Sequence, residues 1–191
     1  IPGGAKRIAV LDFGVKYSIL QSLVDRDCTV LVYPARTDAE TIWKSRPDGV
    51  VLSNGPGNPK DSWDAVKTIR VLADRVPIMG ICLGHQLLAL AYGADTEKLK
   101  YGHRGRNHPV VDLKQNRVYM TSQNHGYTVV EESLRSDQAE VTYRNLNDGS
   151  VEGIRLKNKP AFGVQFHPEA CPGPRDTAYL FDELLSLMNK F

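Results

Sequence analysis

The feature that most constrains the fold is an alternation of short β-rich runs with amphipathic stretches along the first half of the chain. The runs rich in branched apolar residues are 7–13, 28–33, 49–53 and 77–81. The stretches between them, with the apolar spacing of helices, are 16–25, 38–45 and 62–73, the last with Ser62 as its predicted N-cap. This order predicts an α/β fold with a parallel sheet and helices on both faces.

The second half of the chain changes pattern after Ala94. The turn-rich segments are 101–105, 114–117 and 145–149, and the alternating strand-like segments are 117–121, 140–143 and 151–156. They predict antiparallel hairpins added at one edge of the sheet. Residues 161–166 predict one more buried strand and 177–189 a closing helix. No repeat or linker divides the chain, so we expect one domain over residues 1–191.

Composition excludes several classes of protein. The 191 residues are 41% hydrophobic and carry 24 Lys+Arg against 22 Asp+Glu, which fits a soluble globular domain. A formal charge of +2 gives no argument for a nucleic-acid partner. The most apolar window, 76–94, contains Pro77, Gly80 and His85, which would be costly in lipid, so we expect no membrane contact.

The cysteines indicate the redox compartment of the protein, and the first residues indicate whether the sequence is a piece of a longer chain. Cys28, Cys82 and Cys171 are odd in number and unrelated in spacing, so they predict no disulfide framework and a reducing, cytoplasmic compartment. The start, Ile1-Pro-Gly-Gly, has neither Met nor a signal pattern. We therefore expect a piece cut from a longer chain.

The strongest local signal is Gly80-Ile-Cys82-Leu-Gly84, which lies between a predicted strand and a predicted helix. A nucleophile elbow is built at such a place, and its turn is too tight for side chains two residues before and two after the nucleophile. At a helix N-terminus the helix dipole also stabilises a thiolate. Cys82 is therefore a candidate nucleophile; the alternative is a small buried cysteine in a glycine-rich turn.

A thiol nucleophile needs a base, and the base needs a group that orients it. His167 follows the apolar run 161–166 and precedes Pro168 and Glu169. A residue before proline is extended, so residues 167 and 169 project to the same side, where a carboxylate can hold the imidazole. Taken alone, His167 could be a satisfied histidine at a strand end. With Cys82 it forms a candidate pair at the carboxyl ends of parallel strands.

The loop Ser53-Asn-Gly55-Pro-Gly57-Asn-Pro59 follows the third predicted strand. Acyl transfer to a thiol creates an oxyanion that backbone N–H groups can stabilise. The N–H of Leu83 and a glycine N–H of this loop are the candidate donors, although Gly-Pro-Gly on its own is only a turn.

Other chemistries find less support. The chain contains neither a P-loop nor a Gly-x-Gly-x-x-Gly motif for nucleotide binding. His103 and His108 lack a second ligand pair at zinc-like spacing, so we predict no metal site. The basic residues of 98–108 are more typical of a solvated hairpin than of a docking surface.

Three motifs occur in order: Asn54-Gly55-Pro-Gly57, Gly80-Ile-Cys82-Leu-Gly84-His85-Gln86, and Gly163-Val-Gln-Phe-His167-Pro-Glu169-Ala. Together they resemble the class I (triad) glutamine amidotransferase family, over nearly all of the chain. The resemblance implies hydrolysis of L-glutamine to glutamate and ammonia. It implies that Cys82 attacks the carboxamide, that His167 transfers the proton and that Glu169 orients His167.

The same resemblance assigns the substrate pocket. Leu83 and the Gly55/Gly57 loop match the oxyanion and substrate loop. The positions that match contacts to the glutamine are Gln86, Asn124, Gly126 and Tyr127. On this comparison His125 is not the base, although its segment lies close to the site.

Within the family, the stretches 53–57, 101–109, 121–127 and 172–174 resemble the glutaminase domain of carbamoyl-phosphate synthase small chains. That implies that the partner is a large synthetase subunit, with ATP and Mg on the partner and no cofactor in this chain. Such small chains begin with another domain, so residues 1–191 would be the C-terminal part of a longer subunit. No role is suggested for Cys171.

Two alternatives stay open. The chain could supply ammonia to another synthetase, such as one that makes anthranilate or a purine nucleotide. It could also be a catalytically silent regulatory domain on the same fold. The presence of all three triad positions argues against the silent domain.

Overall fold

The computed structural model describes residues 1–170 and 173–191. Cys171 and Pro172, the first without a suggested role and the second part of a stretch used for the resemblance, lie outside the described residues.

The first half of the chain forms the predicted parallel sheet. Its strands are β1 (Lys6–Asp12), β2 (Cys28–Pro34), β3 (Gly49–Leu52) and β4 (Ile78–Ile81), in the order β2-β1-β3-β4. The segments between and after them form α1 (Tyr17–Val24), α2 (Ala39–Trp43), the 3-10 helix η1 (Pro59–Asp61), α3 (Trp63–Leu72) and α4 (Leu83–Ala91). The predicted alternation is thus confirmed. Ser62 precedes α3 as predicted, but its side chain makes no capping hydrogen bond.

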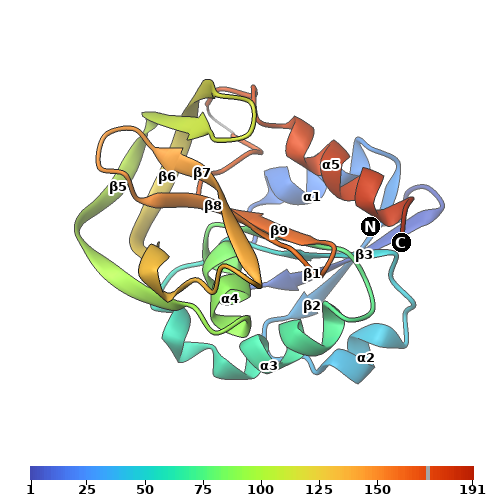
Figure 1. Cartoon of the computed structure of the whole chain (residues 1–191). Helices are drawn as coiled ribbons and strands as arrows, with labels where there is room; N and C mark the ends of the chain where they lie inside the picture. Colours follow the sequence, from blue (N-terminus) through green and yellow to red (C-terminus); the bar gives the residue numbers. More distant parts are fainter. Residues whose placement is uncertain (171–172) are drawn as a thin grey trace.

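Two cores lie on opposite faces of this sheet, because alternate side chains of a strand point to opposite sides. In β1, Ile8 and Val10 pack with α1 and the C-terminal helix α5 (Tyr179–Met188), whereas Ala9 and Leu11 pack on the side of α2, α3 and α4. Figure 1 shows α1 and α5 above the sheet and α2 and α3 below it. Helices therefore cover both faces of the parallel half.

The second half extends the sheet with antiparallel strands. They are β5 (Asp95–Asp112), β6 (Arg117–Val130), β7 (Ala139–Asn145), β8 (Val151–Leu156) and β9 (Ala161–Val164), with η2 (Glu131–Ser133) between β6 and β7. The full order is β2-β1-β3-β4-β9-β8-β7-β5-β6. β9 pairs in parallel with β4 and antiparallel with β8, so it joins the two halves. The predicted hairpins at one edge are confirmed.

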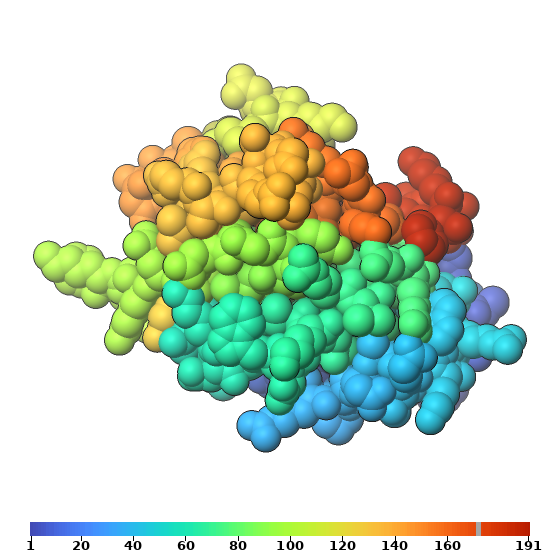
Figure 2. Space-filling view, turned by 60° about the horizontal axis from the view of Figure 1, so that its bottom comes forward, coloured from blue at the N-terminus to red at the C-terminus, as the bar shows by residue number. Residues whose placement is uncertain are grey.

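One predicted turn is wrong. Residues 101–105 belong to the continuous strand β5, whose pairing with β6 shifts register between Lys98 and His103 and again between Gly105 and His108. Gly102 and Gly105 have positive φ angles of 70° and 143°, which bend the strand without ending it. In Figure 2, yellow-green side chains from this part of the chain project at the left, beyond the face covered by α2 and α3. Among the described residues, no helix has the length and apolarity to cross a membrane.

Candidate active site

The site begins at the turn between β4 and α4. Cys82 is the N-cap residue of α4 and has φ 53° and ψ −102°, an unusual backbone conformation for a residue with a side chain. A Cβ at position 80 would lie 2.6 Å from the Gly84 carbonyl oxygen, and one at position 84 would lie 2.2 Å from the Leu52 carbonyl oxygen. Only glycine fits at either place. The structure therefore confirms the tight elbow that the pentapeptide predicted.

Parallel pairing of β4 with β9 brings the end of β9 to the same edge of the sheet. The Cys82 backbone N–H donates to the Val164 carbonyl oxygen at 2.8 Å, and the His167 N–H donates to the Ser122 carbonyl oxygen at 2.9 Å. His167 Nδ1 donates to Glu169 Oε1 at 2.7 Å, since a carboxylate can only accept. Both side chains are buried. The predicted Cys82, His167 and Glu169 are thus brought together.

The neighbours of His167 favour its charged form. Burial opposes protonation, but hydrogen bonds to Cys82 and Glu169 outweigh it and raise the pKa of His167 to about 9. Burial alone would raise the pKa of Glu169; the hydrogen bond from His167 and the charges of His167 and Lys16 instead lower it. At neutral pH the pair is therefore an imidazolium beside a carboxylate, with the imidazolium also hydrogen-bonded to the Cys82 sulfur.

Lys16 is a site residue that sequence reasoning missed. Its Nζ lies 3.4 Å from Glu169 Oε1 and 3.3 Å from His167 Nδ1. Its side chain is 41% exposed while that of Glu169 is fully buried, so Lys16 brings positive charge to the carboxylate from the solvent side. The available signal was its place just after β1, at the carboxyl edge where open α/β sheets place their sites.

Gln165 is a second residue that was missed. The Gln86 Nε2 donates to the Tyr127 carbonyl oxygen at 2.8 Å and to Gln165 Oε1 at 2.9 Å. With its oxygen held there, Gln165 Nε2 points at Cys82 and lies 3.6 Å from Sγ. A chain of amide contacts therefore links the backbone of β6 to the candidate nucleophile.

A cavity of about 400 Å³ opens beside Cys82 and His167. The predicted substrate and oxyanion residues Gly55, Gly57, Leu83, Gln86, Asn124, Gly126 and Tyr127 all line it. Arg104, which sequence reasoning did not select, also lines the cavity. A Cβ at position 55 would lie 2.4 Å from the Phe13 carbonyl oxygen, so glycine is needed for the close approach of this loop. Binding of a ligand to these residues stays a prediction.

His125 lines the cavity but cannot serve as the base at neutral pH. Its Nδ1 donates to the Tyr127 carbonyl oxygen at 2.7 Å, and burial lowers its pKa to about 3. His85 is fully buried, and burial lowers its pKa to about 3 as well. His167 is thus the histidine that combines access to the cavity with a thiol and a carboxylate.

Comparisons with known proteins find relatives over nearly the whole chain. The sequence model of the family described as glutamine amidotransferase class-I matches residues 9–187. The chain is 56% identical to the carbamoyl phosphate synthase small chain of Bacillus caldolyticus, over 100% of this chain and 52% of the relative. It is 53% identical to the pyrimidine-specific small chain of Halalkalibacterium halodurans, over 98% of this chain and 52% of the relative. The chain thus spans about half the length of the curated relatives it matches.

A solved structure supports the fold independently. A protein of Thermoplasma acidophilum assigned to GMP synthase superposes with a TM-score of 0.83 at 23% identity, over 97% of this chain and 94% of the other. At that identity the likeness concerns the fold alone. The family match over most of the chain, with the elbow, the histidine motif and the glycine loop around one cavity, shows that the chain belongs to the class-I glutamine amidotransferase family.

Proposed function

We propose that this chain hydrolyses L-glutamine as the glutaminase component of a carbamoyl-phosphate synthase, through a glutamyl thioester on Cys82. The observation that carries the proposal is the meeting of Cys82, His167 and Glu169 beside one cavity, with the thiol on a strained elbow at a helix N-terminus. The identity of 56% to a carbamoyl phosphate synthase small chain supports that synthase rather than another.

In the proposed reaction, Cys82 Sγ attacks the carboxamide carbon of glutamine while His167 holds the thiol proton. The oxyanion lies beside the N–H groups of Leu83 and the Gly55/Gly57 loop; Leu83 is in the first turn of α4, where backbone donors lack an intrahelical acceptor. His167 then protonates the leaving ammonia. Water attacks the thioester with His167 as base, and glutamate leaves as the Cys82 thiolate is restored.

The remaining residues have supporting roles in this proposal. Glu169 keeps the His167 ring oriented, and Lys16 keeps Glu169 ionised. Gln86, Asn124, Gly126 and Tyr127 hold the substrate in the cavity. No cofactor is needed for the hydrolysis itself. ATP and Mg belong to a large synthetase subunit, which consumes the ammonia.

The test measures glutamate and ammonia release by the chain alone and with the large chain of a carbamoyl-phosphate synthase, and then glutamine-dependent carbamoyl phosphate formation. We expect hydrolysis in the wild-type chain, none above background in Cys82→Ser, and carbamoyl phosphate only when both proteins are present. Glutamine-dependent formation of anthranilate or GMP with the matching synthetase, and no carbamoyl phosphate, would reassign the partner. Hydrolysis that survives Cys82→Ser would contradict the mechanism.

A further inference from the structure

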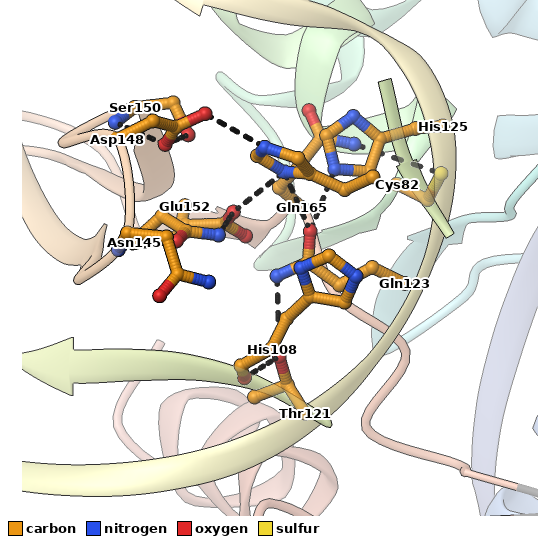
Figure 3. A network of polar contacts seen from close by, with 12 residues as sticks. Cys82, His108, Thr121, Gln123, His125, Asn145, Asp148, Ser150, Glu152 and Gln165 are labelled. Atoms are coloured by element: carbon orange, nitrogen blue, oxygen red, sulfur yellow. Dashed lines mark hydrogen bonds and ion pairs between the residues drawn. The ribbon is translucent and has the colours of Figure 1, made fainter. Parts of the chain in front are cut away.

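A second group of buried polar side chains lies between β5, β6 and β8 and reaches the wall of the cavity through His125. We call His103, Gln123, His125 and Glu152 the histidine–glutamate cluster. His103 and His125 are 8% and 7% exposed, and Glu152 is fully buried. Figure 3 shows Gln123 and His125, both from β6, converging with Glu152 from β8. The proposed hydrolysis of glutamine uses none of these side chains.

The ring nitrogens that point away from the centre of the cluster, and one Glu152 oxygen, are held by hydrogen bonds to residues around it. His125 Nδ1 donates to the Tyr127 carbonyl oxygen at 2.7 Å, and His103 Nε2 donates to Asp148 Oδ2 at 2.8 Å. Asn145 Nδ2 donates to Glu152 Oε1 at 2.9 Å. Histidines that bind metal ions almost always donate their other ring N–H to a carboxylate or a backbone carbonyl in this way. The arrangement fixes which ring nitrogens face inward.

The inner atoms are mostly acceptors that face one another. With its proton on Nδ1, neutral His125 presents a lone pair on Nε2, yet Gln123 Oε1 lies 2.8 Å from it. The same oxygen lies 3.0 Å from His103 Nδ1, while Gln123 Nε2 is used by Thr121 Oγ1 at 3.1 Å. Glu152 Oε2 is buried and has no hydrogen-bond partner among residues 1–170 and 173–191. The lone pairs of His125 Nε2 and Glu152 Oε2 are thus left without a donor, and a bound cation would satisfy both.

The inner atoms also have a suitable spacing. One ligand atom each from His103, His125 and Glu152 lies within 4.8 Å of the others, and His103 Nδ1 lies 3.4 Å from Glu152 Oε1. Tetrahedral zinc, with bonds of about 2.0–2.1 Å, requires ligand atoms about 3.4 Å apart. One pair already has this separation, and the other two lie within 4.8 Å.

We propose that the histidine–glutamate cluster binds one Zn²⁺ ion through His103 Nδ1, His125 Nε2 and the Glu152 carboxylate, with Gln123 Oε1 or a water as fourth ligand. Two imidazoles with one carboxylate are a ligand set that zinc prefers over magnesium or calcium. The spacing of histidines along the sequence predicted no metal site, because the ligands come from three separate strands and only the fold brings them together.

The ion would tie β8 to the β5–β6 hairpin. It would also fix the ring of His125, whose Nδ1 holds the Tyr127 carbonyl oxygen that Gln86 contacts as well. The site is therefore structural: it stabilises the antiparallel half and the cavity wall without taking part in the hydrolysis.

The binding test uses the Cys82→Ser/Cys171→Ser chain, so that these two thiols cannot capture the metal. After removal of metal with a chelator, Zn²⁺ alone is titrated in competition with a chromophoric chelator, and metal content is measured after gel filtration. We expect one zinc per chain and a higher melting temperature. Co²⁺ should give the visible bands of a tetrahedral site without thiolate charge transfer. A chain that binds no Zn²⁺ overturns the proposal.

Variants locate the ion. Glu152→Gln keeps an acceptor for Asn145 but removes the charge, and should abolish stoichiometric binding. Asp148→Asn, which alters only the outer partner of His103, should weaken binding about 10–100-fold. The matched control is His108→Gln, because the His108 ring is 5.1 Å from that of His103 but is not a proposed ligand. Binding that survives Glu152→Gln, or that His108→Gln removes equally, would place the ion elsewhere.

A further measurement needs no substitution in the cluster. It therefore tests the proposal even if the variants fail to fold. Long-range ¹H–¹⁵N spectra report the state of each histidine ring nitrogen. One equivalent of Zn²⁺ should shift His103 Nδ1 and His125 Nε2 and leave His85 unchanged. If the resonances of His103 and His125 do not respond, the cluster is held by protons alone and the proposal is wrong.

Discussion

The protein contains two buried clusters in which a histidine meets a carboxylate, and they differ in what else faces the ring. In the thiol cluster (Cys82, Gln165, His167 and Glu169), hydrogen bonds overcome burial and raise the pKa of His167 to about 9. In the histidine–glutamate cluster, hydrogen bonds to Glu152 and Asp148 overcome burial and also raise the pKa of His103 to about 9. Cys82 and His167 line the 400 Å³ cavity, whereas His103 and Glu152 do not.

This difference shows what identifies a histidine suited to proton transfer. A carboxylate partner and a raised pKa are common to both clusters, so neither is diagnostic. Both clusters reach the cavity, the second through His125, but only the first places a thiol on a strained elbow against its charged histidine. The two clusters therefore make matched partners for experiments, because equivalent changes should affect activity in one and stability in the other.

The largest expected effect comes from the thiol. Cys82→Ser should lower kcat for glutamine hydrolysis about 10⁴-fold or more, because a hydroxyl is a far weaker nucleophile than a thiolate. Glutamate release measures the effect, and circular dichroism checks that the variant folds. The matched change Glu152→Gln in the other cluster should leave kcat within about threefold. Equal losses in both variants would remove the distinction between the clusters.

The next effect separates the two carboxylates. Glu169→Gln should lower kcat about 10²–10³-fold, because the His167 ring loses the acceptor that orients it and stabilises its charge. Asp148→Asn makes the same change beside His103 and should lower kcat less than about threefold. Steady-state kinetics of both variants, side by side, measures the contrast. A large loss of kcat in Asp148→Asn would show that the second cluster takes part in the reaction.

A smaller effect is expected from the glutamine amide of each cluster. Gln165→Leu removes the N–H that points at Cys82 Sγ and should lower kcat/KM about 10–100-fold, since hydrogen bonds to charged groups contribute about 1.5–3 kcal/mol. Alkylation by a glutamine-like electrophile should also be slower in this variant, because Sγ loses this donor. Gln123→Leu is the matched control, with an unchanged alkylation rate. A merely structural Gln165 would lower the melting temperature and leave the alkylation rate unchanged.

The smallest effect is on stability as a function of pH. In the metal-free chain, His103 and His167 have raised pKa values of about 9, so their stabilisation is complete below about pH 6.5 and is lost as pH rises through about 9. His85 and His125 have pKa values lowered to about 3, so their contribution is complete above about pH 6.5 and is lost as pH falls toward 3. The melting temperature should therefore be highest near neutral pH.

Two variants separate the loss of stability at alkaline pH into the contribution of His103 and that of His167. Asp148→Asn should reduce the part due to His103, and Glu169→Gln the part due to His167, each by a few degrees in the melting temperature above about pH 8. Thermal unfolding followed by circular dichroism across this range provides the measurement. An alkaline loss unchanged in both variants would mean that neither histidine titrates as described.

The sequence predicted those parts of the site that depend on local pattern. Gly80 and Gly84 identified the elbow because the tightness of that turn is a property of five consecutive residues. His167 and Glu169 were found because the run before them marks a buried strand. The alternation in the first half likewise predicted its strands and helices, since periodicity follows from which faces are buried.

The parts that were missed depend on contacts between distant segments. Lys16 lies 151 residues from His167 in the sequence, and Gln165 lies 83 residues from Cys82. No local spacing predicts either contact. The turn predicted at 101–105 failed for a related reason: glycines there suggested a break, but pairing with β6 carries the strand through two bulges. The histidine–glutamate cluster likewise exists only once β5, β6 and β8 are aligned.

The central place of β9 determines when the protein can become active during its synthesis. β9 is the last strand among residues 1–170 and 173–191, yet it lies between β4 and β8 and ends three residues before His167. A nascent chain that ends before residue 161 carries the thiol but lacks the base and leaves one edge of β4 unpaired. Such late, long-range pairing is slow and leaves exposed edges open to misassembly. Under the proposed function, synthesis must therefore pass residue 169 before glutamine can be hydrolysed.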